Sequence, residues 1–181
     1  AASLRYVDEE TGDIVVLDGV NLKLGQLKSD GSPVPVDAEL SFDVQPSGLK
    51  GTLNLDTDLA FNSDSGLLQL SDLSVDSTVE GLASIPTRMS IKTDAVEVSS
   101  NESQVALQPV ELSMLDMDIA VDVQPFSYEG AITPKATIAI DAFSPRSVMQ
   151  LFDVVPPETA DPVALSRLII DATAELTGSA I

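Results

Sequence analysis

Aspartates spaced two residues apart are the clearest candidates for chemistry in this chain. Asp56 and Asp58 form one such pair, and Asp116 and Asp118 form a second. On a β-strand, residues two apart point to the same side, so either pair could hold calcium or act as paired carboxylates. The same spacing suits a solvated strand face. The surroundings favour that interpretation because they contain neither an EF-hand loop nor aromatic platforms for sugars. We therefore predict no catalytic residue and no metal site.

The residue types missing from the chain narrow its chemistry further. It contains no cysteine and no histidine, which excludes a thiol nucleophile, a Ser-His-Asp triad and an ordinary zinc or haem site within this chain. The acids Asp8, Glu9, Glu10 and Asp13 surround Gly12 and suit a soluble hairpin tip better than a cation site. Neither a Gly-x-Ser-x-Gly elbow nor a nucleotide-binding glycine pattern is present. The sequence predicts a protein that is not an enzyme and uses no cofactor.

Net charge limits the possible partners. The 181 residues carry a formal charge of -20, which repels nucleic acid backbones and anionic membrane surfaces. A lipid ligand would therefore have to be held through its acyl chains. No apolar run reaches the ~20 residues that span a bilayer. There is no signal peptide pattern at Ala1, and the first and last residues of the sequence are both predicted to lie in strands. We interpret residues 1–181 as one segment of a longer protein whose membrane anchor lies outside it.

Alternation of apolar and polar residues dominates the chain and predicts a mainly β fold. Long stretches, above all residues 34–44 and 49–61, place apolar side chains at every second position, which is typical of antiparallel strands with one buried face. Turn signals separate roughly nine to eleven such strands into a meander. The residues expected to line the apolar face and contact acyl chains are Leu40, Phe42, Leu53, Leu55, Leu59, Phe61, Met117, Ile119 and Val121.

Two interruptions modify the pattern. The apolar positions change parity near Ser71 and Asp72, which predicts a β-bulge. Strands are expected over residues 1–143, two short helices over about 144–168, and a final strand over 169–181. Each helix is predicted from a capping residue followed by proline, Ser144-Pro145 and Asp161-Pro162. The apolar face is compatible with a closed β-sandwich core and with a curved, half-open sheet or trough; alternation alone does not decide between them.

Several stretches resemble the AsmA family. The segment 4–12 resembles the family's hydrophobic-x-Tyr-x-Asp-x-x-Thr-Gly hairpin, and the segments 143–146 and 156–165 resemble its Phe-x-x-Arg and Pro-x-Thr-Ala-Asp-Pro-x-Ala-Leu motifs. The matching positions are Tyr6, Asp8, Gly12, Phe143, Arg146, Thr159, Asp161, Pro162 and Leu165. The resemblance brings no catalytic residues. It implies a module of a periplasmic protein anchored in the inner membrane of a Gram-negative bacterium.

The resemblance also favours the trough over the sandwich and implies a function. AsmA-like proteins are linked to outer-membrane biogenesis, so the expected ligands are acyl chains of phospholipid or lipopolysaccharide, moved along an apolar groove in the sheet. One alternative is a structural or assembly module with a closed sandwich core that binds envelope proteins. A second alternative is a calcium-dependent adhesion or carbohydrate-active domain, which would need clustered acids and bound metal.

Overall fold

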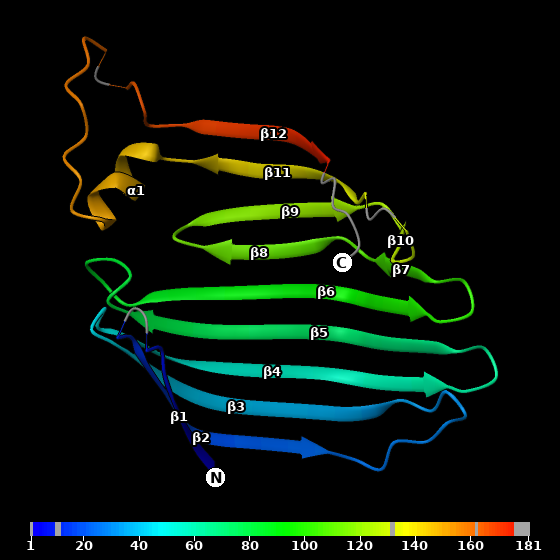
Figure 1. The fold of residues 1–181 in the computed structure, drawn as a ribbon. Coiled ribbons are helices and arrows are strands. Elements are labelled where there is room, and N and C mark those ends of the chain that lie inside the picture. The colour runs from blue at the N-terminus through cyan, green and yellow to red at the C-terminus, as the bar shows by residue number, and fades with distance from the viewer. Residues whose placement is uncertain (1, 10–11, 131–132, 162, 176–181) are drawn as a thin grey trace.

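The computed structural model describes residues 2–9, 12–130, 133–161 and 163–175, and these form one antiparallel sheet of twelve strands (Figure 1). The predicted mainly β fold is confirmed. The strands are β1 (Ala2–Val7), β2 (Ile14–Leu24), β3 (Val34–Gln45), β4 (Leu49–Asn62), β5 (Leu67–Glu80), β6 (Thr87–Ser99), β7 (Gln104–Leu107), β8 (Val110–Met114), β9 (Met117–Val123), β10 (Phe126–Ser127), β11 (Lys135–Phe143) and β12 (Leu168–Glu175).

The strands follow one another across the sheet almost in chain order, as the predicted meander requires. The path runs β1-β2-β3-β4-β5-β6-β8-β9-β11-β12. The long strand β6 has two successive neighbours on the same side: its first half pairs with β8 and its last residues pair with β7, which also pairs with β10. Most neighbouring strands are therefore close in sequence; the longest connection, residues 144–167, joins β11 to β12.

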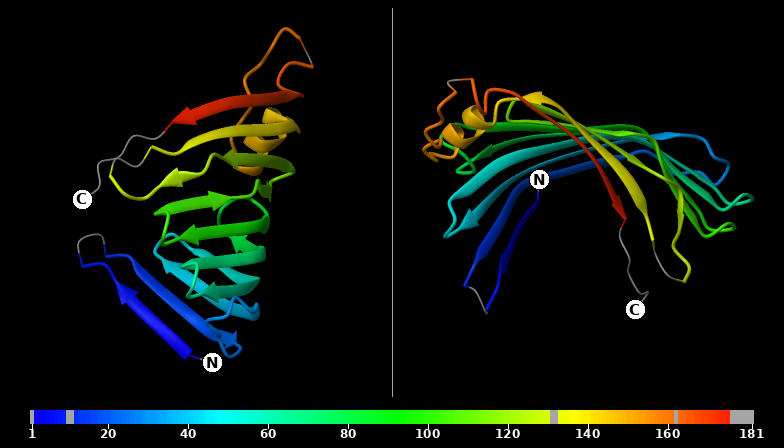
Figure 2. Two further views of the ribbon diagram at one scale, coloured as in Figure 1. Left: turned by 90° about the vertical axis from the view of Figure 1, so that its right-hand side faces the viewer. Right: turned by 90° about the horizontal axis from the view of Figure 1, so that it is seen from above.

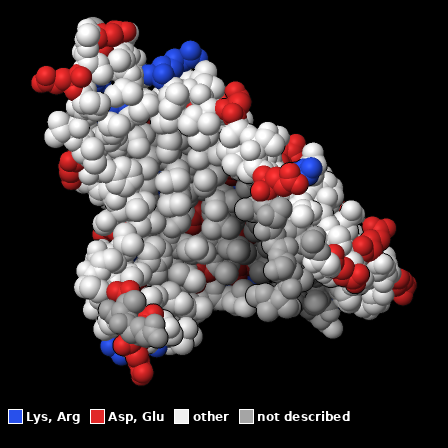
Figure 3. Space-filling model, turned by 45° about the horizontal axis from the view of Figure 1, so that its top comes forward, with Lys and Arg blue, Asp and Glu red and all other residues white. Residues whose placement is uncertain are grey.

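The sheet is an open trough. It curves both along the strands and across them, so that β1 at one edge and β12 at the other bend toward the same side (Figure 2). The space-filling view shows the hollow that results, with walls that are mostly uncharged (Figure 3). Within the described residues no second sheet packs against the first. The closed sandwich considered from the sequence is therefore wrong, and the half-open sheet is confirmed.

The parity change near Asp72 is a β-bulge, as predicted. The β4–β5 register slips between Asp56 and Asp58, and Asp72 has a positive φ of 52°. The buried Thr57 spans the bulge by donating its hydroxyl to the Ser71 carbonyl at 2.9 Å. The bulge returns the leucines of β5 to the same face on both sides of the irregularity.

The β8–β9 connection is tighter than the alternation suggested. Leu115, which fits the period of the following strand, lies instead in a two-residue turn with Asp116, and both have positive φ values, 51° and 58°. Consecutive residues in that region form a type I′ turn, whose twist matches the flanking strands. The turn is closed by the pair Met114 and Met117.

Only the first of the two predicted helices exists in the described part of the chain. Helix α1 (Pro145–Leu151) begins with Ser144 as N-cap, whose hydroxyl accepts from the Ser147 amide at 3.2 Å. It lies beyond one end of the strands (Figure 1), away from the concave face as the turned views show (Figure 2). Among the described residues, no helix is long and apolar enough to cross a membrane.

The predicted second helix is wrong because the backbone turns instead. The Ala164 amide donates to Asp161 and the Ser166 amide to Val163, both at 3.1 Å, as in successive tight turns. Leu165 then has a φ of 63°, which a helix does not tolerate. Strand β12 already begins at Leu168. The proline of this motif, Pro162, and the end of the predicted final strand, 176–181, lie outside the described residues.

Candidate apolar trough

Strand register brings the predicted residues of β3 and β4 onto one face. Leu40 lies directly opposite Leu53, Leu55 lies opposite Ala38, and Leu59 lies opposite Val34. Phe42 lies opposite Gly51, so its ring occupies the space that a side chain at that position would fill. The alternation in the sequence therefore placed these residues correctly with respect to one another.

The second predicted group, on β9, joins the first through a continuous apolar row. Each member lies directly opposite the next on the neighbouring strand, from β2 to β12. The row consists of Leu22, Ala38, Leu55, Val75, Ile91, Leu112, Ile119, Ile140 and Ile170. It contains the predicted Leu55 and Ile119. The other seven were not in the predicted set, although the same alternation marks most of them.

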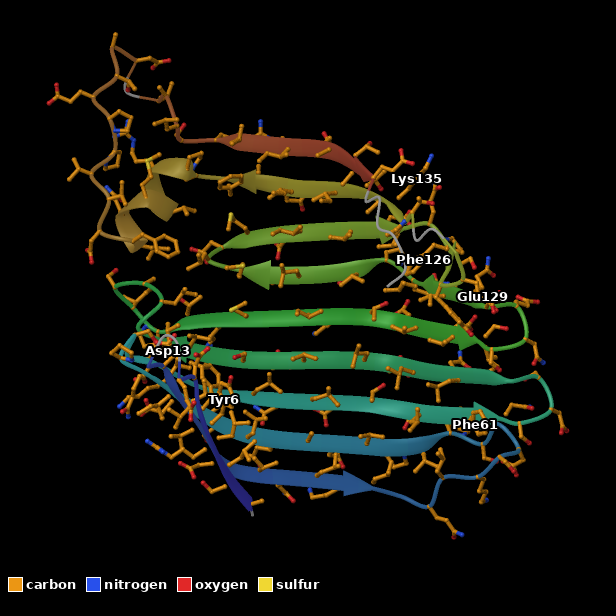
Figure 4. The ribbon with its side chains drawn as sticks, in the orientation of Figure 1. Tyr6, Asp13, Phe61, Phe126, Glu129 and Lys135 are labelled. Carbon is orange, nitrogen blue, oxygen red and sulfur yellow. The ribbon has the colours of Figure 1, made fainter. Side chains whose placement is uncertain are left out.

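Further predicted residues extend the apolar face on either side of this row. Val121 lies between Val110 and Ile138, one pair further along β9. Phe61 faces Leu68 near the other end of β4, and Phe126 of β10 lies at the same end of the sheet (Figure 4). Apolar side chains therefore reach from one end of the strands to the other.

Backbone hydrogen bonding shows that this face is the concave one. The Gln124 amide donates to the Lys135 carbonyl at 2.9 Å, so the polar backbone groups of Gln124 point toward β11. In Figure 1, β9 runs left to right below β11, with the concave side toward the viewer. For an L-residue on a strand that runs left to right, with its amide and carbonyl pointing up, the side chain points away from the viewer. The Gln124 side chain therefore lies on the convex side. Side chains alternate along a strand, so Val123 points to the side opposite Gln124, into the hollow. Val121 and Ile119, two and four residues before Val123, point the same way.

Much of the apolar surface on the concave face is accessible to solvent. None of the described large side chains is fully buried, and the most buried apolar residues are Val34 and Ala60. Exposure is greatest toward the β1–β2 edge, where Leu22 is 64% exposed and Leu4 60% exposed, yet Ile91 in the middle of the sheet is still 36% exposed. An extended apolar surface left open in this way is typical of a binding surface.

The opposite, convex face carries the acids. Asp43 forms an ion pair with Lys50 at 3.4 Å, and Asp37 lies directly opposite Asp56. A hydrogen bond between the two carboxyls raises the pKa of Asp56, and burial and the negative charge of Asp37 act in the same direction. The two faces of the sheet thus differ sharply in polarity.

The predicted aspartate pairs form no metal-binding cluster. Asp116 lies in the β8–β9 turn, whereas Asp118 lies on β9 and accepts from the Ser113 hydroxyl at 2.6 Å. Across the described ranges no three acidic side chains gather as metal ligands would. Asp56, Asp116 and Asp118 are exposed, whereas Asp58 is half-buried.

The residues matching the family motifs mainly hold local structure together; by strand register Tyr6 also lies on the concave face, in line with Val15 and Val44. Tyr6 lies on the exposed strand β1, and the Gly12 amide donates to the Asp8 carbonyl in the turn that follows (Figure 4 labels Tyr6). At the other end, the Arg146 guanidinium donates to the Ala164 carbonyl at 3.3 Å, and its amide donates to Leu165. These contacts attach α1 to the turn before β12.

The remaining motif residues are also local. Phe143 ends β11 opposite Leu168, and the Thr159 hydroxyl donates to the Asp161 carbonyl at 2.8 Å. The motif thus fixes how the chain leaves β11 and returns as β12.

Fold and site together define an open, single-layer β-trough with an apolar concave face and an acidic convex face. In comparisons with known proteins, no family model, no curated protein and no solved structure matches this chain. Its resemblance to the AsmA family therefore stays a prediction from the motif residues.

Proposed function

We propose that this chain is a non-enzymatic, lipid-contacting module of a cell-envelope protein, with acyl chains held on the concave face. The observation that carries the proposal is the continuous apolar row across nine strands, left open to solvent. The AsmA resemblance supports phospholipid or lipopolysaccharide as the lipid. It also supports a periplasmic location within an inner-membrane-anchored protein involved in outer-membrane biogenesis.

The size of the trough suits acyl chains. Nine strands spaced about 4.8 Å apart make the row roughly 38 Å long. A hydrocarbon core about 30 Å thick contains two layers of lipid, so one acyl chain spans about 15 Å. The row therefore accommodates more than one chain end to end. Burial of each methylene contributes about 0.8 kcal/mol, so a single chain supplies ample driving force.

The charge distribution complements this binding mode. Acids on the convex face and a net charge of -20 repel anionic headgroups and membrane surfaces. The acyl chains therefore remain the attractive part of the ligand, with headgroups directed out of the hollow into water. The same charge keeps a sheet with an open apolar face soluble.

Adjacent residues on β9 provide a matched test. Ile119 points into the trough and its neighbour Ala120 points to the convex face, opposite Glu111 and Ala139. Protein expressed in bacteria is analysed by native mass spectrometry and lipid extraction. We expect co-purifying lipid in the wild type and in Ala120→Asp, and its loss in Ile119→Asp. Equal lipid content in both variants, or none in a folded wild type, would contradict the proposal.

A second function, protein binding through the sheet edges, is favoured by a separate observation. All six residues of β1 are exposed, and the outer sides of β1 and β12 pair with no described strand. Such edges accept an added strand from a partner. The Asp8 amide donates to the Asp13 carbonyl, so it points toward β2. Because successive amides on a strand point to opposite sides, the Arg5 amide, three residues earlier, points away from β2 into solvent. Arg5→Pro should therefore abolish cross-linking to a partner at this edge while leaving the sheet folded; unchanged cross-linking would exclude this edge.

A further inference from the structure

Three of the four methionines in the chain lie side by side on the concave face. Strand register places Met114 of β8 directly opposite Met89 of β6 on one side and Met117 of β9 on the other. All three side chains are half-buried. The fourth, Met149, lies on helix α1. Met89, Met114 and Met117 are called the methionine cluster below.

Local structure holds the cluster together. Met114 and Met117 close the type I′ turn at Leu115 and Asp116, so their strands cannot separate without breaking the turn. Strands in a sheet are spaced about 4.8 Å apart, and side chains on a concave face converge above that spacing. Methionine has three rotatable bonds, so three sulfurs on adjacent strands can reach a common point.

The chemistry of the cluster differs from that of the rest of the trough. Thioether sulfur is a soft ligand that selects Cu(I) over hard cations such as calcium, which prefer carboxylate oxygen. Because the chain has no cysteine and no histidine, its methionines are its only soft metal ligands. The net charge of -20 raises the local concentration of any cation.

We propose that the methionine cluster binds one soft monovalent cation, Cu(I) or Ag(I), through three thioether sulfurs. Binding is coordination alone, with no change in oxidation state. The cluster shares the concave face with the proposed lipid contact and includes Met117, but its ligands are sulfur atoms, so metal binding does not require bound lipid. The competing explanation is that three flexible apolar side chains simply fill this part of the face, and it predicts no metal affinity.

The test is a titration of the whole 181-residue chain, labelled at the methionine methyl groups, with Ag(I) in chloride-free buffer. Ag(I) avoids the redox chemistry of copper. We expect the NMR signals of Met89, Met114 and Met117 to shift together and to saturate at one equivalent, while Met149 stays in place. Met114→Leu should weaken binding at least tenfold. Met149→Leu, the matched control, should bind like the wild type.

Three results would overturn the proposal: four methyl signals that shift without saturating at one equivalent, a Met114→Leu variant that titrates like the wild type, or an equal response to calcium. The last would show attraction to charge alone. Leucine preserves apolar volume, so folding should survive, and circular dichroism checks it. If Met114→Leu fails to fold, Met89→Leu and Met117→Leu separately provide the same comparison.

Discussion

Replacing Thr57 by valine tests whether the threonines on the apolar face repair its irregularities. Thr57 lies among apolar neighbours, is only 9% exposed, and donates its hydroxyl to the Ser71 carbonyl at 2.9 Å across the β4–β5 bulge. Valine has nearly the same shape but cannot donate. Loss of the donor to a buried carbonyl costs about 1–3 kcal/mol. The added methyl group offsets about 0.8 kcal/mol of that cost. We therefore expect the free energy of unfolding to fall by about 1 kcal/mol.

Urea unfolding followed by circular dichroism measures this change. With a urea dependence of about 2 kcal/mol per molar, the midpoint should fall by about 0.5 M. Thr52→Val is the matched control because Thr52 lies on the same strand but is exposed, so its effect should stay within about 0.5 kcal/mol. An unchanged midpoint for Thr57→Val, or equal losses in both variants, would refute the claim that the hydroxyl stabilises the bulge.

Three further predictions concern single positions. Gly51→Ala should destabilise the protein by about 1–3 kcal/mol in urea unfolding, because the new Cβ would collide with the Thr78 carbonyl oxygen of β5 and would also lie 2.7 Å from Phe42 Cζ. Asp72→Val should cost about 1–2 kcal/mol, whereas Asp72→Gly should cost nothing, because only glycine adopts a φ of 52° freely. The raised pKa of Asp56 means that its contribution to stability is fully present below its unfolded-state pKa and is lost as the pH rises through the folded value. Asp56→Asn should therefore flatten the dependence of the melting temperature on pH in the acidic range and relieve repulsion with Asp37 at neutral pH.

Each of these has a result that would contradict it. Equal stability of Gly51→Ala and the wild type would mean that the Thr78 backbone and the Phe42 ring both shift freely. Equal loss for the two Asp72 variants would remove backbone strain as the cause. A melting temperature whose acidic pH dependence is the same with asparagine at position 56 would show that the carboxyl hydrogen bond does not form in solution.

Alternation in the sequence was enough to predict most of the sheet. Residues two apart on a strand share a face, so the long apolar series in β3 and β4 revealed both the strands and their apolar sides. The change of parity revealed the bulge at Asp72 for the same reason. Alternation says nothing about whether that face meets a second sheet, because both arrangements need the same pattern. The open trough became visible only in three dimensions.

The errors arose where local backbone geometry competes with side-chain pattern. Asp161 followed by Pro162 is typical of the start of a helix. Here, however, the Asp161 carboxylate accepts from the Val163 amide at 2.9 Å, and Leu165 has a positive φ. Tight turns of this kind use the same capping residues as helices. Leu115 fitted the strand period yet lies in a type I′ turn. The register that assembles the methionine cluster was likewise absent from the sequence, because it depends on β6 exchanging one neighbour for another.

That exchange explains a second threonine on the apolar face and connects stability to ligand binding. Thr93, 6% exposed, donates to the Gln108 carbonyl at 3.1 Å where the partner of β6 changes from β8 to β7. Threonine hydroxyls thus satisfy backbone groups at irregularities, but they add little apolar burial. With no large side chain fully buried among the described residues, hydrophobic stabilisation of the free sheet is limited. A lipid that covers the concave face should supply what is missing. At a free concentration one hundred times its Kd, binding to the folded state alone adds about 2.7 kcal/mol. Delipidated protein should therefore unfold at a lower urea concentration than lipid-loaded protein, and Ile119→Asp should abolish that difference while Ala120→Asp preserves it.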